Sequence, residues 1–337
     1  MDDGKRIKRV KIEKSDMNYL ERVTELAWKI YEKECRSVPE ILEAKKEDLC
    51  RELRKMFDME TMLLCIDQEE LVGFLGYHQL WEKCDQLFFA IPFWGYGAAG
   101  TNRAKVLSYL FQSLADQLST KEKVHFEVKI YVHDEETIRL FSFLQFGILC
   151  EEGCFHYPLE KVVSDEAQVS AVIWQDGKMQ SHFKVREITA EEKGDRWSEI
   201  WSILQQLINH LQKNPVFYKG EEFTEEAYQS YLMEENTKVL IAENNGRIIG
   251  ILCAGKDGNS FLNNGKNWYN IGDLFVDSNY RGSGLAQLLL SEMIRSLKES
   301  GFEKFWVEHG TANPNARGFW NKYFDSYLYT MTRVIER

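Results

Sequence analysis

Small residues occupy the junction between an apolar strand that ends at Val276 and the amphipathic helix that follows. The junction reads Arg281-Gly282-Ser283-Gly284-Leu285-Ala286. Glycines let a backbone fold tightly around an anion, and the first N–H groups of a helix point at it with the positive end of the helix dipole. The spacing predicts a phosphate or pyrophosphate site, to which Arg281 adds charge-assisted hydrogen bonds. A glycine-rich turn that only connects two elements is the alternative.

The same junction resembles the acyl-CoA signature of the GCN5-related N-acetyltransferase (GNAT) family, which reads (Gln/Arg)-x-x-Gly-x-(Gly/Ala). Arg281, Gly284 and Ala286 fill its specified positions. Residues 313–323 resemble the family's Asn-x-x-Ala-x-x-Phe-Tyr-x-Lys helix, and residues 273–276 resemble its fourth strand. With these motifs in order, the chain is identified as a member of this family.

The resemblance implies that acetyl-CoA binds as co-substrate between a splayed fourth and fifth strand. Its pantetheine arm would pair with backbone around Phe275 and Val276, and a backbone N–H near Val276 would polarise the thioester carbonyl. The pyrophosphate would rest on the amides of the junction, and Asn313 matches a position that contacts the pantetheine end. The expected cofactor-binding residues are Phe275, Val276, Arg281, Gly282, Ser283, Gly284, Leu285, Ala286 and Asn313.

The resemblance also implies an N-acetyltransferase in which an amine attacks the thioester directly, so that positioning supplies much of the rate. The usual general base is a carboxylate, for which Asp273 and Glu308 are the candidates; either could instead be solvated or structural. The family often protonates the departing thiolate with a tyrosine where this chain has Trp320. Tyr323, one helical turn later, could replace that tyrosine or could be a packing residue. The missing tyrosine also leaves open a scaffold that binds CoA without catalysis.

The chain matches itself at nearly constant spacing, which predicts two copies of one fold. Residues 61–78 run parallel to 237–255 at an offset of 176 before their turn and 177 after it. Each copy is expected to be an α+β, α/β/α-layered GNAT-type domain with a mixed, mostly antiparallel sheet flanked by helices. The expected organisation is a first domain at 1–158, a linker at 159–181 and a second domain at 182–337.

Hydrophobic periodicity and turn residues predict the elements of the second copy. Strands are expected at 183–188, 239–242, 248–254, 270–276, 302–308 and 327–335. Helices are expected at 191–212, 223–235, 285–299 and 314–323. The first copy is expected to follow the same order.

In the first copy, the counterpart of the glycine-rich junction lacks the Arg-x-x-Gly-x-Gly pattern, and Phe93, Trp94 and Tyr96 crowd it. We therefore expect a degenerate copy that does not bind CoA. The segment Gly95–Gly100 also fits the dinucleotide-binding fingerprint. A nicotinamide-dependent oxidoreductase is therefore an alternative function.

Composition narrows the partners. The 53 acidic residues exceed the 42 basic ones and give a net charge of −11, which disfavours binding to nucleic acid and to anionic membranes. The same charge favours a small cationic amine as substrate, such as an aminoglycoside, a polyamine or a lysine-like compound. A solvated acidic surface is the alternative explanation of the charge. Trp268, Tyr269 and Trp320 could cradle this amine or could be packing residues. Neither the seven cysteines nor the seven histidines show metal-ligand spacing. Without a signal-like or membrane-spanning stretch, a cytoplasmic location is expected.

Overall fold

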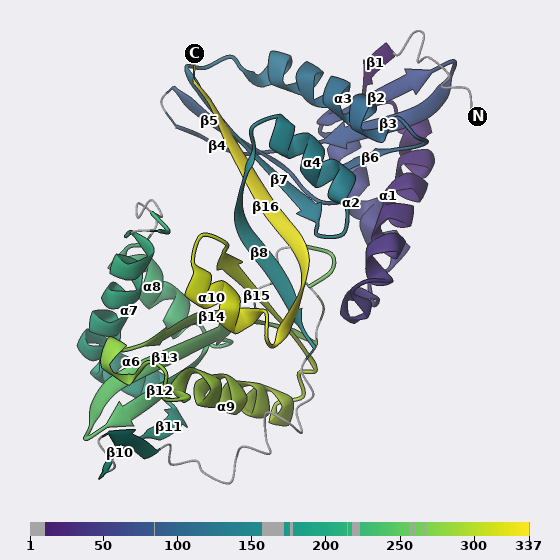
Figure 1. The fold of residues 1–337 in the computed structure, drawn as a ribbon. Coiled ribbons are helices and arrows are strands. Elements are labelled where there is room, and N and C mark those ends of the chain that lie inside the picture. Colours follow the sequence, from purple (N-terminus) through teal and green to yellow (C-terminus); the bar gives the residue numbers. More distant parts are fainter. Residues whose placement is uncertain are drawn as a thin grey trace. The chain divides into compact units, whose positions relative to one another are not determined.

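The structure is a computed structural model that describes residues 11–83, 85–156, 172–175, 178–213, 215–217, 223–256, 258, 260–263, 265 and 267–336. The chain divides into two compact units. Figure 1 colours the chain by residue number, from purple at the N-terminus to yellow at the C-terminus. The first unit contains Met1–Glu152 together with Ser326–Arg337, and the second unit is Gly153–Asp325. This division differs from the expected domains at 1–158 and 182–337, because the C-terminal strand belongs to the first unit.

The second unit has the element order expected from the sequence. Its strands are β11 (Lys184–Glu187), β12 (Lys238–Asn244), β13 (Arg247–Gly255), β14 (Trp268–Val276) and β15 (Lys304–Gly310). Its helices are α6 (Ala190–Asp195), α7 (Trp197–Leu211), α8 (Glu225–Met233), α9 (Leu285–Glu299) and α10 (Pro314–Trp320), with a 3-10 turn η5 (Ser278–Tyr280) after β14. The helix expected at 191–212 is interrupted at Arg196, which leaves helical geometry while its guanidinium binds Glu199 and Glu243.

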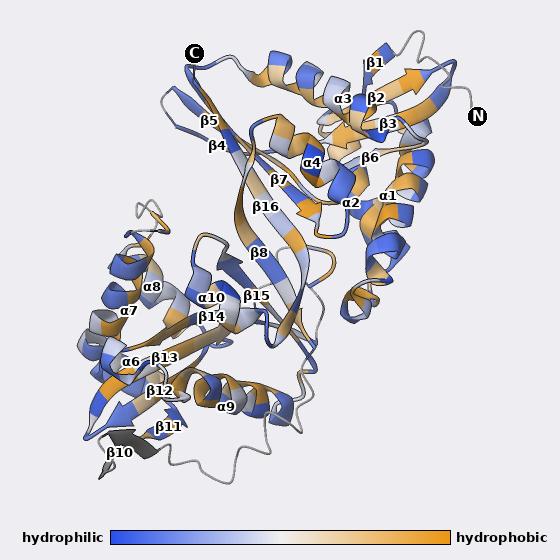
Figure 2. Cartoon of the chain, in the orientation of Figure 1, coloured by the Kyte–Doolittle hydropathy of each residue, from blue (hydrophilic) through white to orange (hydrophobic). Residues whose placement is uncertain are grey.

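The sheet of the second unit has helices on both faces (Figure 1). β11, β12, β13 and β14 pair antiparallel, and β14 pairs parallel with β15. Successive residues of β12 point to opposite faces: Leu240 joins the core that includes α9, whereas Ile241 joins the core that includes α7 and α8. A strand covered on both faces needs apolar or small residues at every position. β13 meets this requirement, since it is buried from Ile248 to Gly255 and lies in the hydrophobic part of the colour range in Figure 2.

The first unit repeats this order of elements. Its strands are β1 (Lys11–Lys14), β2 (Met62–Asp67), β3 (Glu70–Gly76), β4 (His78–Lys83), β5 (Gln86–Ile91), β6 (Tyr96–Ala98), β7 (Lys123–Tyr131), the first part of β8 (Gly147–Phe155) and most of β16 (Phe324–Glu336). Its helices are α1 (Leu20–Cys35), α2 (Lys46–Asp58), α3 (Arg103–Leu118) and α4 (Glu135–Phe143), with 3-10 turns η1 (Met17–Tyr19) and η2 (Pro39–Ile41).

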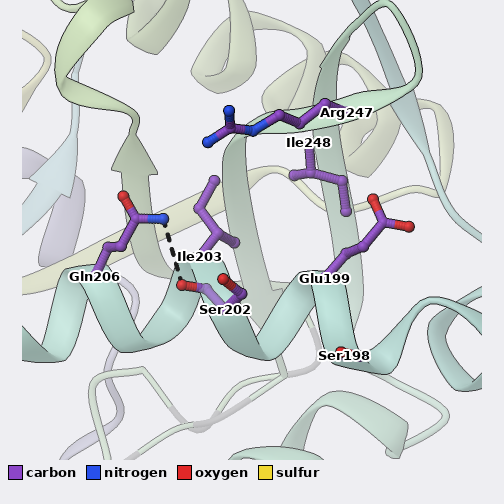
Figure 3. A pocket seen from close by; sticks show the side chains of 7 residues that line it. All are labelled: Ser198, Glu199, Ser202, Ile203, Gln206, Arg247 and Ile248. Carbon is purple, nitrogen blue, oxygen red and sulfur yellow. Dashed lines mark hydrogen bonds between the residues drawn. The ribbon is translucent and has the colours of Figure 1, made fainter.

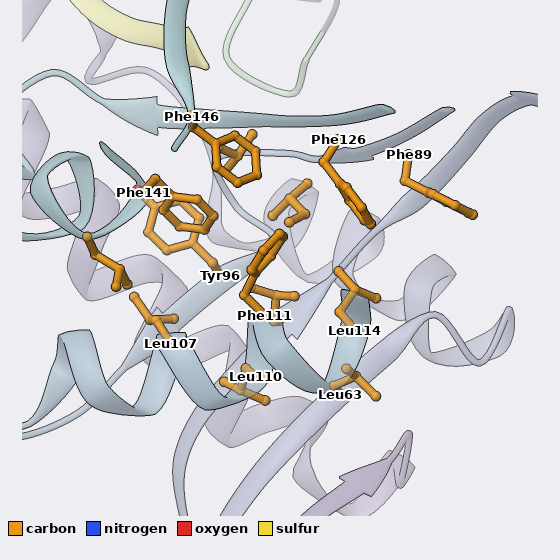
Figure 4. Packing of buried hydrophobic residues seen from close by; sticks show 14 of the residues in the cluster. Leu63, Phe89, Tyr96, Leu107, Leu110, Phe111, Leu114, Phe126, Phe141 and Phe146 are labelled. Carbon is orange, nitrogen blue, oxygen red and sulfur yellow. The ribbon is translucent and has the colours of Figure 1, made fainter. Parts of the chain in front are cut away.

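An aromatic core holds the first unit together. Phe111 of α3, Phe126 of β7 and Phe141 of α4 are buried, and their rings meet edge to face at 5.4 and 5.7 Å between centroids (Figure 4). Edge-to-face pairs of this kind add to the stability that burial alone provides. The same core contains Tyr96 of β6.

The C-terminal strand β16 completes the first unit. It pairs antiparallel with β7, from Leu328 opposite Tyr131 to Glu336 opposite Lys123. The Tyr327 hydroxyl also donates a hydrogen bond of 2.7 Å to the fully buried Glu152 of β8. This pairing explains why the last residues of the chain are counted with the first unit.

The expected linker at 159–181 contains a two-stranded antiparallel pair, β9 (Val172–Gln175) and β10 (Lys178–His182). Residues 159–171, 176 and 177 of that linker lie outside the described residues. In the described part of the chain, no helix combines the length and the apolar character needed to cross a membrane.

Candidate active site

β14 and β15 separate soon after they meet. Their parallel pairing runs from Trp268 opposite Lys304 to Asn270 opposite Trp306, and both strands then continue beyond these residues. Backbone N–H and C=O groups in a sheet need partners, so the facing edges of two separated strands can accept an extended ligand. The structure therefore shows the splayed pair of strands expected from the family resemblance.

The glycine-rich junction lies directly after β14 and η5. Gly282 and Gly284 have φ of +77° and +86°, a left-handed backbone conformation that residues with a Cβ rarely adopt. A Cβ built on either glycine meets nothing within 4 Å, so open space lies in front of the backbone. α9 begins at Leu285, and no side chain in the described residues caps it. Its first N–H groups are therefore available to an anion, as a pyrophosphate requires.

Arg281 is exposed beside this helix terminus. Its Nε donates to the carbonyl oxygen of Val276 at 3.1 Å, and its guanidinium lies 5.4 Å from the ring centroid of Phe275. These contacts engage Nε and one face of the guanidinium of Arg281. The side chains of Ser283 and Leu285 are engaged within the protein, so these residues can offer a ligand mainly their backbone N–H groups. The Ser283 hydroxyl donates a hydrogen bond to the carbonyl oxygen of Tyr280, and Leu285 is buried in the core.

A β-bulge in β14 places Asp273. Leu252 of β13 lies opposite Leu274 and Ala254 lies opposite Ile271, so Gly272 and Asp273 together face the single residue Cys253. A bulge of this kind redirects a side chain and often occurs beside an active site. Here it turns Asp273 toward α8, where the Tyr228 hydroxyl donates a hydrogen bond to the carboxylate.

The surroundings of Asp273 favour a proton acceptor. Burial raises the pKa of Asp273 above its ordinary value, and the hydrogen bond from Tyr228 partly offsets this effect. Its influence on neighbouring groups is visible at Cys253, where burial first and the Asp273 charge second raise the pKa of the thiol. When ionised, a carboxylate with a raised pKa binds a proton more readily than an exposed aspartate does.

The other two catalytic candidates lie on different faces of the sheet. Phe305 and Val307 of β15 join the α9 core, so the strand alternation places Glu308 on the opposite face, the one covered by α7 and α8. Glu308 is exposed there. Tyr323 instead packs against the α9 core, with its ring 5.3 Å from that of Phe319. The structure therefore places Asp273 and Glu308 on one face and Tyr323 on the other.

Three aromatic residues expected near the acceptor are packing residues. Trp268, Tyr269 and Trp320 are between 2% and 5% exposed. Tyr269 and Trp320 belong to the α9 core, and the Tyr269 hydroxyl bonds the carbonyl of Asn236. The ammonium of Lys304 lies 5.3 Å from the ring centroid of Trp268, and the burial of all three side chains leaves little ring surface for an external amine.

Asn313 is the N-cap residue of α10. Its Oδ1 accepts from the backbone N–H of Ala316 at 3.3 Å, and it is 7% exposed. Its Nδ2 lies 3.4 Å from Nε2 of His210, in the last turn of α7.

The sequence did not indicate His210 or Tyr228 as members of this site. Neither residue belongs to a motif, and their partners Asn313 and Asp273 are distant in sequence.

A recess of about 290 Å³ follows the same side of α7 toward His210. Ser198, Ser202 and Gln206 line it at four-residue spacing, together with Arg247 and Ile248 of β13 (Figure 3). The next position on this helical face is His210. The recess contains none of the residues of the glycine-rich junction, so it is a neighbouring groove rather than the cofactor site itself.

In the first unit, protein groups fill the places that a cofactor would need. Phe93 is buried with its ring 5.1 Å from that of Tyr131. At the start of α3, the N–H of Ala104 donates to the carboxylate of Glu136 at 3.2 Å. Arg103 forms a bidentate ion pair with the buried Asp134, at 2.9 and 3.2 Å. A carboxylate thus occupies the helix N-terminus at which a phosphate would otherwise bind.

The dinucleotide-binding alternative for the first unit is wrong. Its fingerprint requires the glycines to lie in a turn that opens a helix after a parallel strand. Gly97 instead lies inside β6, which pairs antiparallel with β3. The helix begins only at Arg103. In the part of the chain that the structure describes, no three His, Cys, Asp or Glu side chains are grouped to hold a metal ion.

Comparison with known proteins agrees with this geometry. Residues 204–325 match the model of the acetyltransferase (GNAT) family, so this segment of the second unit belongs to that family. The fold is similar to a GCN5-related N-acetyltransferase from Sphaerobacter thermophilus, at 14% identity over 98% of this chain and 97% of that chain, with a TM-score of 0.55. It is also similar to a GCN5-related glucosamine N-acetyltransferase region of a fungal multi-domain GH3 β-N-acetylglucosaminidase, at 12% identity over 96% of this chain and 38% of that chain, with a TM-score of 0.50. The expected family and fold class are confirmed.

Proposed function

We propose that the second unit is an N-acetyltransferase that transfers an acetyl group from acetyl-CoA to a small cationic amine. The observation that carries this proposal is the combination of the splayed strands β14 and β15 with the uncapped N-terminus of α9. The first offers backbone to the pantetheine arm, and the second offers N–H groups to the pyrophosphate. The residues in these roles are Phe275, Val276, Arg281, Gly282, Ser283, Gly284, Leu285, Ala286 and Asn313.

The acceptor must lose a proton before it can react, because amines are mostly charged at neutral pH. Asp273, directly or through a water, takes this proton, and the exposed Glu308 on the same face attracts the cation. The neutral nitrogen then attacks the thioester carbonyl carbon, a C–N bond forms, the C–S bond breaks, and the coenzyme leaves as a thiolate. The backbone N–H near Val276 stabilises the negative charge on the carbonyl oxygen during this step. The nitrogen then loses its second proton, which passes directly or through solvent to the thiolate, so that the products are a neutral amide and the coenzyme thiol.

The decisive experiment is an acetyl-CoA binding measurement by calorimetry, followed by thiol release with a panel of amines. The panel contains aminoglycosides, amino sugars, polyamines, lysine derivatives and a peptide N-terminus. Binding with amine-dependent thiol release supports the transferase. Binding without thiol release from any amine would favour the non-catalytic scaffold, which the burial of Trp320 in the core keeps as the second candidate function.

Tyr323 has little role in this mechanism, because it packs on the face opposite Asp273. We expect Tyr323→Phe to slow turnover of a confirmed substrate by about tenfold or less, since a coenzyme thiolate is a good leaving group that needs little protonation. Steady-state thiol release measures this change. An inactive Tyr323→Phe enzyme with normal acetyl-CoA affinity would show instead that Tyr323 donates a proton to the thiolate.

The first unit is expected to remain empty, so that one acetyl-CoA binds per chain. Calorimetric stoichiometry tests this expectation, and the matched variant is Glu136→Gln, which keeps the volume of the side chain but removes the charge at the start of α3. We expect this variant to leave acetyl-CoA affinity within about twofold of the unaltered protein. Gly97 is unsuitable for this test, because a Cβ there would lie 2.6 Å from the ring of Phe74. A second bound coenzyme would contradict the expectation.

A further inference from the structure

The contacts of Asn313 favour one protonation state of His210. Because Oδ1 of Asn313 accepts from the N–H of Ala316, the amide nitrogen Nδ2 is the atom that faces the imidazole, 3.4 Å from Nε2. An amide nitrogen can only donate, so Nε2 must carry a lone pair. A neutral His210 with its proton on Nδ1 is the form that makes this contact a hydrogen bond.

The surroundings of His210 agree with this assignment. Burial, and secondly the positive charge of Arg281, lower the pKa of His210 below its ordinary value. The imidazole, the guanidinium of Arg281 and the amide of Asn313 thus come together from three separate segments: the end of α7, the glycine-rich junction and the start of α10. His210 is the one of the three whose role the family motifs do not specify.

We propose that His210 is a positioning residue of the acetyl-CoA site, which fixes the amide of Asn313 and the first turn of α10 beside the glycine-rich junction. The inference rests on the proposed function, because Arg281 and Asn313 are the residues that bind acetyl-CoA in it. A side-chain amide that is already oriented loses less conformational entropy when a ligand binds. His210 supplies this orientation without adding charge near Arg281.

The first unit contains a counterpart of this contact. Glu34 lies near the end of α1, one repeat offset of 176 residues before His210. Its Oε1 is 2.8 Å from Nδ1 of His133, which adjoins Asp134, the N-cap residue of α4. Both units therefore join the end of their long helix to the start of their last helix through polar side chains. In the second unit, the glycine-rich junction in front of α9 remains open to an anion.

The test compares two substitutions of His210 with a neighbouring control. Leu removes the acceptor while keeping a side chain of similar bulk, whereas Gln restores an acceptor oxygen for Asn313. The control is Asn209→Leu, because Asn209 is exposed and adjacent on α7. We expect His210→Leu to weaken acetyl-CoA binding about fivefold in calorimetry, which corresponds to one neutral hydrogen bond. His210→Gln and Asn209→Leu should stay within about twofold.

A double variant tests whether His210 affects acetyl-CoA binding through Asn313. In an Asn313→Ala background, His210→Leu should weaken binding no further, because the amide that it positions is absent. Equal losses in His210→Leu and His210→Gln, fully multiplicative effects with Asn313→Ala, or unchanged affinity in His210→Leu would each overturn the inference. If the unaltered protein does not bind acetyl-CoA, the proposed function fails as well. If it binds and only the His210 variants behave otherwise than expected, the proposed function stands and this inference alone is wrong.

Discussion

Arg281→Glu is expected to reduce acetyl-CoA affinity more than 100-fold. The substitution replaces a cation at the N-terminus of α9 by a carboxylate that both repels the pyrophosphate and competes for the same N–H groups. The first unit provides a precedent within the molecule, because Glu136 accepts from an N–H at the start of α3. Calorimetry with acetyl-CoA measures the loss, and Lys298→Glu, at an exposed position near the end of α9, controls for the change in net charge.

Gly284→Val tests the same site by backbone geometry. Gly284 has φ of +86°, so valine would be strained there and would also project into the open space before α9. The matched control is Gly194→Val in α6, where a Cβ also meets nothing within 4 Å and φ is negative in a helix. We expect loss of acetyl-CoA binding in the first variant and normal binding in the second. Retained affinity in both Arg281→Glu and Gly284→Val would refute the cofactor site.

Asp273→Asn is expected to slow turnover of a confirmed substrate about 100-fold or more, with acetyl-CoA affinity nearly unchanged. The substitution removes the proton acceptor but keeps an oxygen for the hydroxyl of Tyr228. Glu308→Gln is the comparison, and a smaller effect is expected there because Glu308 is exposed. If neither variant slows turnover, the assignment of the base to these carboxylates is wrong.

The pH dependence of the same reaction has a defined sign. The base acts only when ionised, so kcat/KM should fall as pH decreases through the pKa of Asp273. Because burial raises that pKa, the fall should begin at a higher pH than for an exposed aspartate. Stability should change in the opposite sense: a raised folded-state pKa means that the charge of Asp273 destabilises the fold at neutral pH. Asp273→Asn should therefore have an equal or higher Tm, which a purely structural role would not predict.

Much of the fold was predictable because local signals agreed with each other. The turn at Gly246, the helix end at Gly301 and the apolar periodicity between them gave α9 its exact bounds and placed β12 and β13 within a few residues. The glycine-rich junction was equally visible, since positive φ at Gly282 and Gly284 is a requirement that sequence alone can express.

The other parts of the site depend on tertiary structure. The bulge that redirects Asp273 arises from the pairing of β14 with β13, and Gly272, a glycine inside a strand, is the residue that could have indicated it. The contact of His210 with Asn313 joins residues 103 positions apart in sequence. The strand expected at 327–335 was assigned to the second domain, whereas β16 pairs with β7 of the first unit. The apolar pattern of a strand predicts the strand but does not specify its partner.

The position of β16 has a consequence for the order in which the protein folds during synthesis. The second unit is continuous in sequence, so it can close once Asp325 has left the ribosome. The first unit is translated earlier, yet it lacks the strand that pairs with β7 until residues 328–336 emerge. During that interval β7 exposes unpaired backbone groups, the feature that promotes pairing between nascent chains. The first unit thus depends on a strand that is translated after the second unit. A chain terminated after Asp325 would contain every residue of the second unit, but its first unit would leave one edge of β7 unpaired.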